Sequence, residues 1–382
     1  MKILFVSMHS VHAIRWIENL KDTSFELFWY DVINKGKLNA MKSLTQFSNL
    51  QKRKVSHMKG EYFLSKKAPG IYQFIRPLVE VTENEALESI IKEIKPDVIH
   101  SFEMQSCSYP ILKTMNKFSG IKWIYSCWGN DLYYYQDLRN HKFKIKNVLQ
   151  RIDYLHTDCM RDYYLAKSLG FKGNYLGVIP GGTGYKIKQL EHFKLPIEKR
   201  KIILIKGYQH LFGRGLNIVK ALESSSEVTE KYDVVIFGAH KVVFDYVEEN
   251  NLNYKIYSRH GLSHQELLEL MGMAVLYIGN NISDGMPNTL LEAIVMGAFP
   301  IQSNPGNATA EIIEDGVNGF LIENPEDVTA IQDKILKALA SPDLLKNAFE
   351  INSKLAEEKL DYEINREKVI SIYNSIYNET RF

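Results

Sequence analysis

Cysteines are few in this sequence, and long apolar runs are missing. Its 382 residues hold three cysteines, Cys107, Cys127 and Cys159. An odd number at such wide spacing fits neither a disulfide framework nor a zinc knuckle, so we expect reduced cysteines in a cytoplasmic protein. Apolar stretches such as Ile3–Val6 are far shorter than the ~20 residues that cross a bilayer. Ser7 ends this stretch too early for the apolar region of a signal peptide.

Three common nucleotide- and metal-binding motifs are also missing. No GxGxxG dinucleotide loop follows the first apolar stretch, and no GxxxxGK[ST] phosphate loop occurs anywhere. The sequence has no Asp-x-Asp pair of the kind that holds a nucleotide through a metal ion. We therefore expect a protein with no metal ion and no cofactor.

Charge is divided unequally between the two halves of the chain. The formal net charge is +2, but residues 1–190 carry 28 Lys and Arg against 17 Asp and Glu, whereas residues 191–382 carry 19 against 28. Two halves of opposite sign indicate two domains with different partners. A basic half can face phosphate groups, an anionic membrane or nucleic acid. Of these, we expect no nucleic-acid partner.

Short β-rich apolar runs alternate with helical patterns along the chain. In residues 83–94, for example, apolar side chains recur at the spacing of one helix face. Repeated strand–helix units predict parallel sheets with helices on both faces. A turn-rich linker at 180–196 separates two such series, so we expect two doubly wound domains, 1–184 and 185–363. The expected strands are Ile3–Val6, Val98–His100, Trp123–Ser126, Tyr175–Ile179, Ile202–Ile205, Val234–Phe237, Val275–Ile278 and Phe299–Gln302.

Residues 283–293 carry the most information about function. They follow an expected strand, and ligands of open α/β sheets bind at the carboxyl ends of strands. Gly285 allows a close backbone approach, and Pro287 suits the first position of a helix whose N–H groups would face a ligand. Glu292 is the single charged residue in the 26 positions that begin at Gly285, so its carboxylate needs hydrogen-bond partners. Sugar hydroxyls would suit it. The alternative is a salt-bridged Glu292 with Asp284 as a helix cap.

The carboxylates of this stretch are spaced in a way that resembles glycosyltransferase family 4. Asp284 and Glu292 stand eight residues apart, Gly297 follows, and a segment at 311–319 ends in Asp-Gly-Val-Asn-Gly. The family has the GT-B fold and retains anomeric configuration, which implies two Rossmann-like domains facing each other across a cleft. The resemblance implies that Glu292 binds the nucleotide ribose. It also implies that Asp284, one methylene shorter than the family's glutamate, contacts the donor sugar. The other implied donor-binding residues of this stretch are Gly285, Met286, Pro287, Asn288 and Thr289.

A second part of the resemblance follows the expected strand at 202–205. The family usually has Lys-Gly there, preceded by an arginine, and both cations neutralise the leaving diphosphate. Here Arg214 stands in the lysine position and Gln209 in the arginine position, so one cation is missing. Lys206 and His210 are the candidate substitutes. A planar guanidinium suits diphosphate oxygens, although an ordinary loop cation remains the alternative for Arg214.

The N-terminal half resembles the family less closely. His12 and Arg15 follow the first expected strand, in an opening that is similar to a subset of the family. Trp128 stands where the family usually has a histidine, three residues before Asp131. The resemblance implies that these four residues form the acceptor side. For Asp131, capping a short helix is an equal alternative to bonding an acceptor hydroxyl.

A basic segment with interleaved aromatic residues runs from residue 51 to residue 67 and contains six Lys and Arg. Resting on an anionic bilayer would stabilise such a segment by ~1 kcal/mol per basic residue near the surface. On that interpretation the protein works at the inner face of a membrane. A solvated loop over the acceptor cleft is the alternative.

Together these features predict a metal-independent, retaining glycosyltransferase. The acidic C-terminal domain would hold a nucleotide-sugar, expected to be a UDP-sugar, with Arg214 and Asp284 as the catalytic residues. The basic N-terminal domain, completed by a crossover helix at about 364–382, would hold a glycan or lipid-linked acceptor in polysaccharide or glycoconjugate synthesis. The alternative is a non-catalytic two-domain protein that binds sugars or nucleotides.

Overall fold

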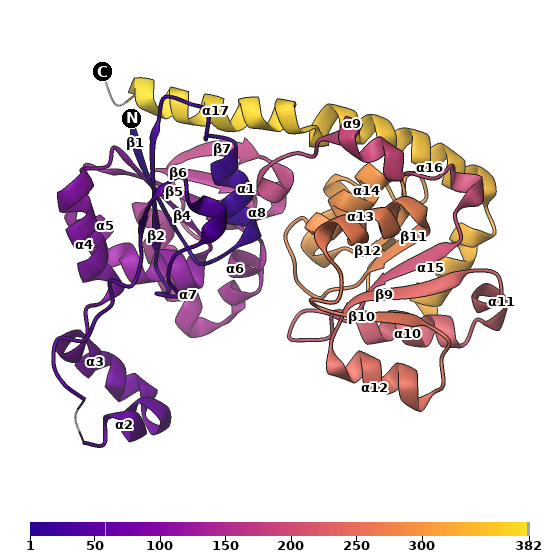
Figure 1. The fold of residues 1–382 in the computed structure, drawn as a ribbon, viewed down its shortest axis with the longest axis horizontal. Coiled ribbons are helices and arrows are strands. Elements are labelled where there is room, and N and C mark those ends of the chain that lie inside the picture. The colour runs from indigo at the N-terminus through magenta and orange to yellow at the C-terminus, as the bar shows by residue number, and fades with distance from the viewer. Residues whose placement is uncertain (58, 380–382) are drawn as a thin grey trace. The chain divides into compact units, whose positions relative to one another are not determined.

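The computed structural model describes residues 1–57 and 59–379, which divide into two compact units (Figure 1). Unit 1 consists of residues 1–157, 163–177 and those from 370 onward, and unit 2 of residues 158–162 and 178–369. Each unit has its own β-sheet with helices packed on it. The two doubly wound α/β sheets expected from the sequence are confirmed.

The sheet of unit 1 has seven strands in the order β3-β2-β1-β4-β5-β6-β7, and the pairs from β3 to β6 are parallel. The order reverses between β1 and β4, so the loops after these two strands meet at a switch point. The strands are β1 (Lys2–Ser7), β2 (Glu26–Asp31), β3 (Thr45–Phe47), β4 (Val98–Phe102), β5 (Lys122–Cys127), β6 (Tyr154–Thr157) and β7 (Asn174–Val178). The helices of this part of the chain are α1 (Val11–Glu18), α2 (Glu61–Lys67), α3 (Pro69–Val79), α4 (Glu83–Ile94), α5 (Leu112–Lys117), α6 (Asn130–Tyr133), α7 (Arg139–Arg151) and α8 (Met160–Ser168).

Strand β1 shows how this sheet is covered on both faces. Successive strand residues point to opposite sides, and all of those from Ile3 to Val6 are fully buried. Leu4 and Val6 belong to a core cluster that includes the buried sides of α4, α5 and α7. Phe5 points the other way, where its ring lies 6.2 Å from that of Phe102. A continuous apolar run is therefore what a central parallel strand requires.

The sheet of unit 2 has six parallel strands in the order β10-β9-β8-β11-β12-β13. The strands are β8 (Ile202–Lys206), β9 (Asp233–Ala239), β10 (Lys255–Ser258), β11 (Ala274–Gly279), β12 (Phe299–Ser303) and β13 (Phe320–Ile322). The helices are α9 (Ile187–Leu190), α10 (Gly215–Glu223), α11 (Ser226–Thr229), α12 (Lys241–Glu249), α13 (His264–Met273), α14 (Asn288–Met296), α15 (Val328–Leu339), α16 (Pro342–Leu355) and α17 (Tyr362–Glu379).

Two core clusters lie on opposite faces of this second sheet. Leu204 and Tyr277 share one cluster with the buried sides of α13 and α14. Ile203 and Ile205, which flank Leu204 on β8 and point to the opposite face, share the other cluster with α10, α12 and α15. Helix α14 ends at Gly297, which has φ 76°. A Cβ at this position would lie 2.4 Å from the Phe349 ring, so both the left-handed turn and the packing need glycine.

The last helix, α17, contributes residues to both units. Its Tyr373 is fully buried within unit 1. The Tyr373 hydroxyl accepts a hydrogen bond from Nε1 of Trp16 at 2.8 Å and lies 2.6 Å from Nδ1 of His100. Burial holds the pKa of His100 well below its ordinary value, so this imidazole is neutral. The end of the chain therefore completes the core of unit 1.

None of the helices in the described part of the chain combines the length and the apolar character that crossing a bilayer requires.

Candidate functional site

The strand order of unit 2 places two loops side by side. β8 and β11 are paired neighbours at the point where the order reverses, and the loops 207–214 and 280–287 follow them. The N–H of Arg214 donates to the carbonyl of Asn280 at 2.8 Å, and the N–H of Ile282 donates to the carbonyl of Phe212 at 2.8 Å. Ligands of doubly wound sheets bind at such a switch point. These two joined loops therefore mark the candidate site.

Arg214 is the last residue before α10, and its guanidinium folds back over its own loop. Nη1 donates to the carbonyls of His210, Leu211 and Gly213 at 3.2, 3.4 and 2.9 Å. Nε donates to Oε1 of Glu326 at 2.5 Å. This hydrogen bond holds the pKa of the Glu326 carboxyl below its ordinary value. A diphosphate bound at this loop would share the arginine with Glu326.

Basic side chains gather at the carboxyl ends of β8, β9 and β10. Lys206, the last residue of β8, is 9 % exposed, and its Nζ lies 4.9 Å from the centre of the Tyr208 ring. The rings of His210 and His240 lie 5.3 Å apart. Burial is the main cause that lowers the pKa of His210, and electrostatic interactions with His240, Lys206 and Arg259 lower it further. These four side chains form a basic cluster that suits an anionic ligand.

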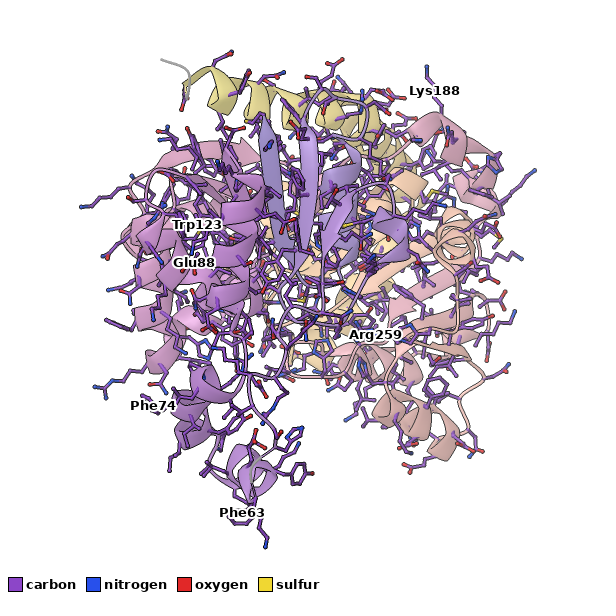
Figure 2. The ribbon with its side chains drawn as sticks, turned by 60° about the vertical axis from the view of Figure 1, so that its left-hand side comes forward. Phe63, Phe74, Glu88, Trp123, Lys188 and Arg259 are labelled. Carbon is purple, nitrogen blue, oxygen red and sulfur yellow. The ribbon has the colours of Figure 1, made fainter. Side chains whose placement is uncertain are left out.

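Gln209 has a local structural role where the resemblance implies a missing arginine. Its backbone N–H donates to Nδ1 of His240 at 3.2 Å, and its Oε1 accepts from the N–H of Leu216 at 3.1 Å. Arg259 (Figure 2) and His240 were missed by the sequence analysis, although each directly follows a strand.

Asp284 is held by its own loop and lies near the basic cluster. Oδ1 accepts from the N–H of Gly285 at 3.0 Å, and Oδ2 accepts from Nδ2 of Asn281 at 3.0 Å. Its negative charge raises the pKa of His210 and so partly opposes the cations around that ring. The helix-cap alternative for Asp284 is wrong, because the N-cap of α14 is Pro287. The expectation that Pro287 opens the helix is wrong for the same reason, since α14 begins at Asn288.

The other predicted donor-binding residues of this stretch form the turn into α14. Gly285, Met286 and Pro287 are buried, whereas Asn288 and Thr289 are partly exposed. The Thr289 hydroxyl lies 2.7 Å from that of Tyr277. The first N–H groups of a helix have no acceptor within it and carry its positive dipole end. The start of α14 thus adds favourable groups for an anion near the basic cluster.

Glu292, in the second turn of α14, is a buried carboxylate with a histidine partner. Its side chain is 4 % exposed, and Oε1 lies 2.8 Å from Nε2 of His264. His264 is the first residue of α13, and its side chain is 52 % exposed. The expectation that this carboxylate needs a partner is thereby met within the protein. Hydroxyls of a ligand would bind Glu292 beside His264 or in its place.

Two of the predicted acceptor-side residues lie together at the switch point of unit 1. His12, in the first turn of α1, and Trp128, after β5, have ring centres 5.0 Å apart. Both side chains are partly exposed. Arg15 is also partly exposed, one turn further along α1. The start of α1 and the loop after β5 therefore present partly exposed aromatic and basic side chains.

Asp131 is buried, and its oxygens are bonded within its own unit. The helix-capping alternative is wrong, because the N-cap of α6 is Gly129. Oδ2 accepts from the Tyr125 hydroxyl at 2.6 Å and from the N–H of Met104 at 3.1 Å. Oδ1 accepts from the N–H of Trp128 at 3.0 Å and from Sγ of Cys127 at 3.2 Å. The carboxylate thus ties the loops after β4 and β5 together.

Glu103, directly after β4 at the switch point of unit 1, is a residue that the sequence analysis did not single out. Its φ of 67° is unusual for a residue with a side chain. Its carboxylate accepts from the N–H groups of Gln105 and Ser106 at 2.9 and 2.6 Å. Burial, followed by the charge of Asp131, raises the pKa of Glu103 to about 7. Nothing in the sequence distinguishes this glutamate from a surface residue.

Family models match both parts of the chain. The model of glycosyl transferases group 1 matches residues 188–355, and the glycosyl transferase 4-like model matches residues 2–159. Comparison with proteins of curated function gave no match.

Solved structures similar to this chain cover it almost completely. Sucrose-phosphate synthase from Thermosynechococcus elongatus has a TM-score of 0.74 at 15% identity, over 99% of this chain and 100% of its own. HepE of Anabaena, solved in complex with UDP and glucose, has a TM-score of 0.69 at 14% identity, over 98% and 100%. A UDP-forming α,α-trehalose-phosphate synthase from Burkholderia xenovorans has a TM-score of 0.65 at 13% identity, over 98% and 99%. At these identities the likeness concerns the fold.

Proposed function

Since this chain belongs to the glycosyltransferases and has their GT-B fold, we propose that it transfers a sugar from a UDP-sugar to a glycan or lipid-linked acceptor. The family and the fold that the sequence implied are thereby confirmed. The donor is proposed because two of the similar structures are described as binding or forming UDP. We place the reaction in polysaccharide or glycoconjugate synthesis in the cytoplasm.

The observation that supports the donor site best is the basic cluster beside the α14 N-terminus. Lys206 and Arg259 lie close enough to His210 to lower its pKa, and Arg214 lies in the loop that follows Lys206. A UDP-sugar brings two phosphate groups whose charge grows as the glycosidic bond breaks. Preorganised cations and helix N–H groups stabilise such developing charge without reorganisation. Glu292 would accept hydrogen bonds from the ribose hydroxyls.

We propose that the reaction retains anomeric configuration. The acceptor hydroxyl attacks C1 of the donor sugar from the face that the diphosphate leaves. The bond between C1 and the diphosphate oxygen breaks, the bond between C1 and the acceptor oxygen forms, and the acceptor proton passes to a diphosphate oxygen. Arg214 would stabilise the leaving group, and Asp284 would hold a hydroxyl of the donor sugar. With Lys206, Arg214 and Arg259 available to neutralise the phosphates, no metal ion is needed.

On the acceptor side, His12, Arg15 and Trp128 offer stacking and hydrogen-bonding groups at the switch point of unit 1. Asp131 is assigned to positioning the loop that carries Trp128, because its oxygens accept four hydrogen bonds within the unit. A non-catalytic sugar or nucleotide binder remains the second candidate. The replacement of the usual family histidine by Trp128 and of the usual arginine by Gln209 favours it.

A screen of sugar nucleotides by thermal shift tests the donor proposal. A ligand that binds the folded state stabilises it by RT ln(1 + [L]/Kd), so the correct UDP-sugar should raise Tm more than other sugar nucleotides do. The transfer proposal is tested separately, by following UDP release from that donor with time. A binder would show the thermal shift without release of UDP.

A further inference from the structure

Helices α2 and α3 of unit 1 carry their large apolar side chains on the outside. They form a hairpin that stands apart from the sheet of its own unit (Figure 1). Figure 2 shows Phe63 of α2 and Phe74 of α3 pointing away from the ribbon. Five apolar side chains of the hairpin are between 58 % and 86 % exposed: Tyr62, Phe63, Ile71, Phe74 and Leu78. A group of exposed apolar residues of this kind marks a surface that binds a membrane or another protein.

One group of polar side chains at the hairpin, by contrast, bonds internally. Nη2 of Arg53 donates to Oε2 of Glu61 at 2.8 Å, and Nη1 donates to Oε1 of Glu80 at 3.1 Å. The hydroxyl of Tyr72 donates to both glutamates, at 2.9 and 3.2 Å. Nε of Arg76 donates to Glu80 at 3.3 Å. This network fixes α2 against α3. The exposed apolar side chains therefore stand on an ordered hairpin that is held together by internal hydrogen bonds.

The outward residues of α3 follow helical spacing. Ile71, Phe74 and Leu78 are three and four residues apart, so they line one face of the helix. Lys59, Lys66 and Lys67 are exposed on the same hairpin. A helical hairpin with one apolar face and flanking lysines matches the composition of helices that lie in the interface of a bilayer.

The charge of the segment identifies the kind of surface it fits. Residues 51–80 contain seven Lys and Arg against two Glu. Both glutamates, Glu61 and Glu80, are already bonded to Arg53. Lys54 is paired with Glu85 at 2.6 Å, whereas Lys59, Lys66 and Lys67 are exposed and can meet an anionic surface. The long stems of Lys66 and Lys67 can lie along apolar groups.

We propose that the α2–α3 hairpin docks unit 1 onto an anionic lipid bilayer. The face made by Ile71, Phe74 and Leu78 enters the boundary between headgroups and acyl chains, and Lys66 and Lys67 contact the lipid headgroups. This inference does not depend on the proposed transfer reaction. It is tested by measuring binding to lipid vesicles, which requires no enzymatic turnover.

Flotation of the full chain with vesicles tests the proposal. We expect binding to vesicles of phosphatidylglycerol and phosphatidylcholine, weak binding to pure phosphatidylcholine, and loss of binding as salt increases. Phe74→Ser should weaken binding roughly tenfold or more, since it removes the most exposed aromatic ring of the patch. The matched control is Phe143→Ser, which removes a ring that is 69 % exposed on α7 of the same unit. Equal losses in both variants, or no binding by the unaltered chain, would overturn the proposal.

Two double variants measure how much the lysines of the hairpin contribute to vesicle binding. Replacing Lys66 and Lys67 by Gln should weaken binding to the anionic vesicles roughly 10- to 30-fold. The control replaces Lys167 and Lys172, two exposed lysines of the same unit, by Gln and should bind as the unaltered chain does. If the two double variants bind alike, the hairpin is not the contact.

A fluorescent label locates the contact directly. The three native cysteines are buried, so a new surface cysteine can be labelled selectively. Gly70, in the first turn of α3, and Gly120, elsewhere in unit 1, are both exposed and have open space for a side chain. An environment-sensitive dye on Gly70→Cys should shift to shorter wavelength with anionic vesicles, whereas the dye on Gly120→Cys should not. A dimer that Phe74→Ser dissociates, combined with an unchanged Gly70→Cys spectrum, would assign the face to a second copy and contradict the proposal.

Discussion

Nε2 of His264 lies 2.8 Å from Oε1 of Glu292, so a half-exposed imidazole closes over a carboxylate that is almost fully buried. The two residues are 28 positions apart and come from the neighbouring helices α13 and α14. A buried carboxylate is costly unless it is hydrogen-bonded. The imidazole therefore supports Glu292 before any ligand is bound.

Glu292→Gln should weaken UDP binding by ~1.5–3 kcal/mol, the usual contribution of hydrogen bonds to a charged group. The fold should survive, because Gln keeps the shape and can still bond His264. Calorimetric titration with UDP measures the change. Glu350→Gln, at an exposed carboxylate on α16, is the matched control and should bind UDP normally. Unchanged affinity in the Glu292 variant would reject the ribose-binding role.

Arg214→Met should lower kcat/KM by roughly 100- to 1,000-fold, as expected when one preorganised group that stabilises developing charge is lost. Glu326→Gln is the informative companion. It removes the carboxylate charge that competes with phosphate for the guanidinium, so UDP should bind as well as before or more tightly. Steady-state kinetics and UDP titration of both variants provide the check. An Arg214→Met enzyme of normal kcat/KM would make this residue an ordinary loop cation.

Turnover should continue in excess EDTA. Lys206, Arg214 and Arg259 supply positive charge at the ends of β8 and β10, where a metal-dependent enzyme would need a divalent ion. The test compares initial rates with chelator alone and with added manganese or magnesium. Activity that disappears in EDTA and returns with either ion would contradict the metal-independent mechanism.

Glu103 should make the free energy of unfolding depend on pH. Burial raises the pKa of Glu103 from its ordinary 4.5 to about 7, so the folded state keeps a proton that the unfolded state loses. This stabilising contribution is fully present below about pH 4.5 and is lost as the pH rises through 7. Across that window, we expect the free energy of unfolding of the unaltered protein to fall by on the order of 2–3 kcal/mol more than that of Glu103→Gln. Denaturant titrations at pH 4.5 and 8 measure it, with exposed Glu93→Gln as control. Parallel pH profiles for the unaltered protein and Glu103→Gln would show that Glu103 titrates normally.

Tyr373→Phe should destabilise unit 1 by ~1–3 kcal/mol, because it leaves Trp16 Nε1 and His100 Nδ1 buried without their shared hydroxyl. Tyr164→Phe removes an exposed hydroxyl on α8 and should change little. Thermal unfolding of the two variants makes the comparison. Equal Tm values would mean that the contacts of the Tyr373 hydroxyl with Trp16 and His100 do not contribute to the stability of unit 1.

Periodicity and apolar runs were enough to predict the central strands and helix α4, whose bounds Glu83–Ile94 agree with the structure. Strands β2, β3, β6, β10 and β13 were missed. Four of these have four residues or fewer, β2 and β10 begin with exposed charged residues, and none is a long apolar run. Strand signals weaken when pairing with neighbours, and not the side-chain pattern, stabilises the strand.

At the site, the sequence pattern located the loops but not the partners of their side chains. The isolation of Glu292 among apolar residues predicted a buried carboxylate with a bonded partner, and its burial is observed. That partner, His264, lies on another helix, and Glu326 lies 112 residues from Arg214. Contacts of this kind depend on which strands become neighbours, which local spacing does not encode. Arg259 joins the basic cluster for the same reason, because it follows the missed strand β10.

The most direct test of the account is the rate at which UDP is released from the UDP-sugar that gives the largest thermal shift. The measurement is made for the unaltered protein, Glu292→Gln and Arg214→Met at a donor concentration that saturates the unaltered protein. We predict steady release by the unaltered protein, strongly reduced release by Arg214→Met, and release by Glu292→Gln that rises further when the donor concentration is increased. Binding of the donor with no release of UDP, with or without candidate glycan acceptors, would contradict the assignment of a transferase and leave a nucleotide-sugar binder.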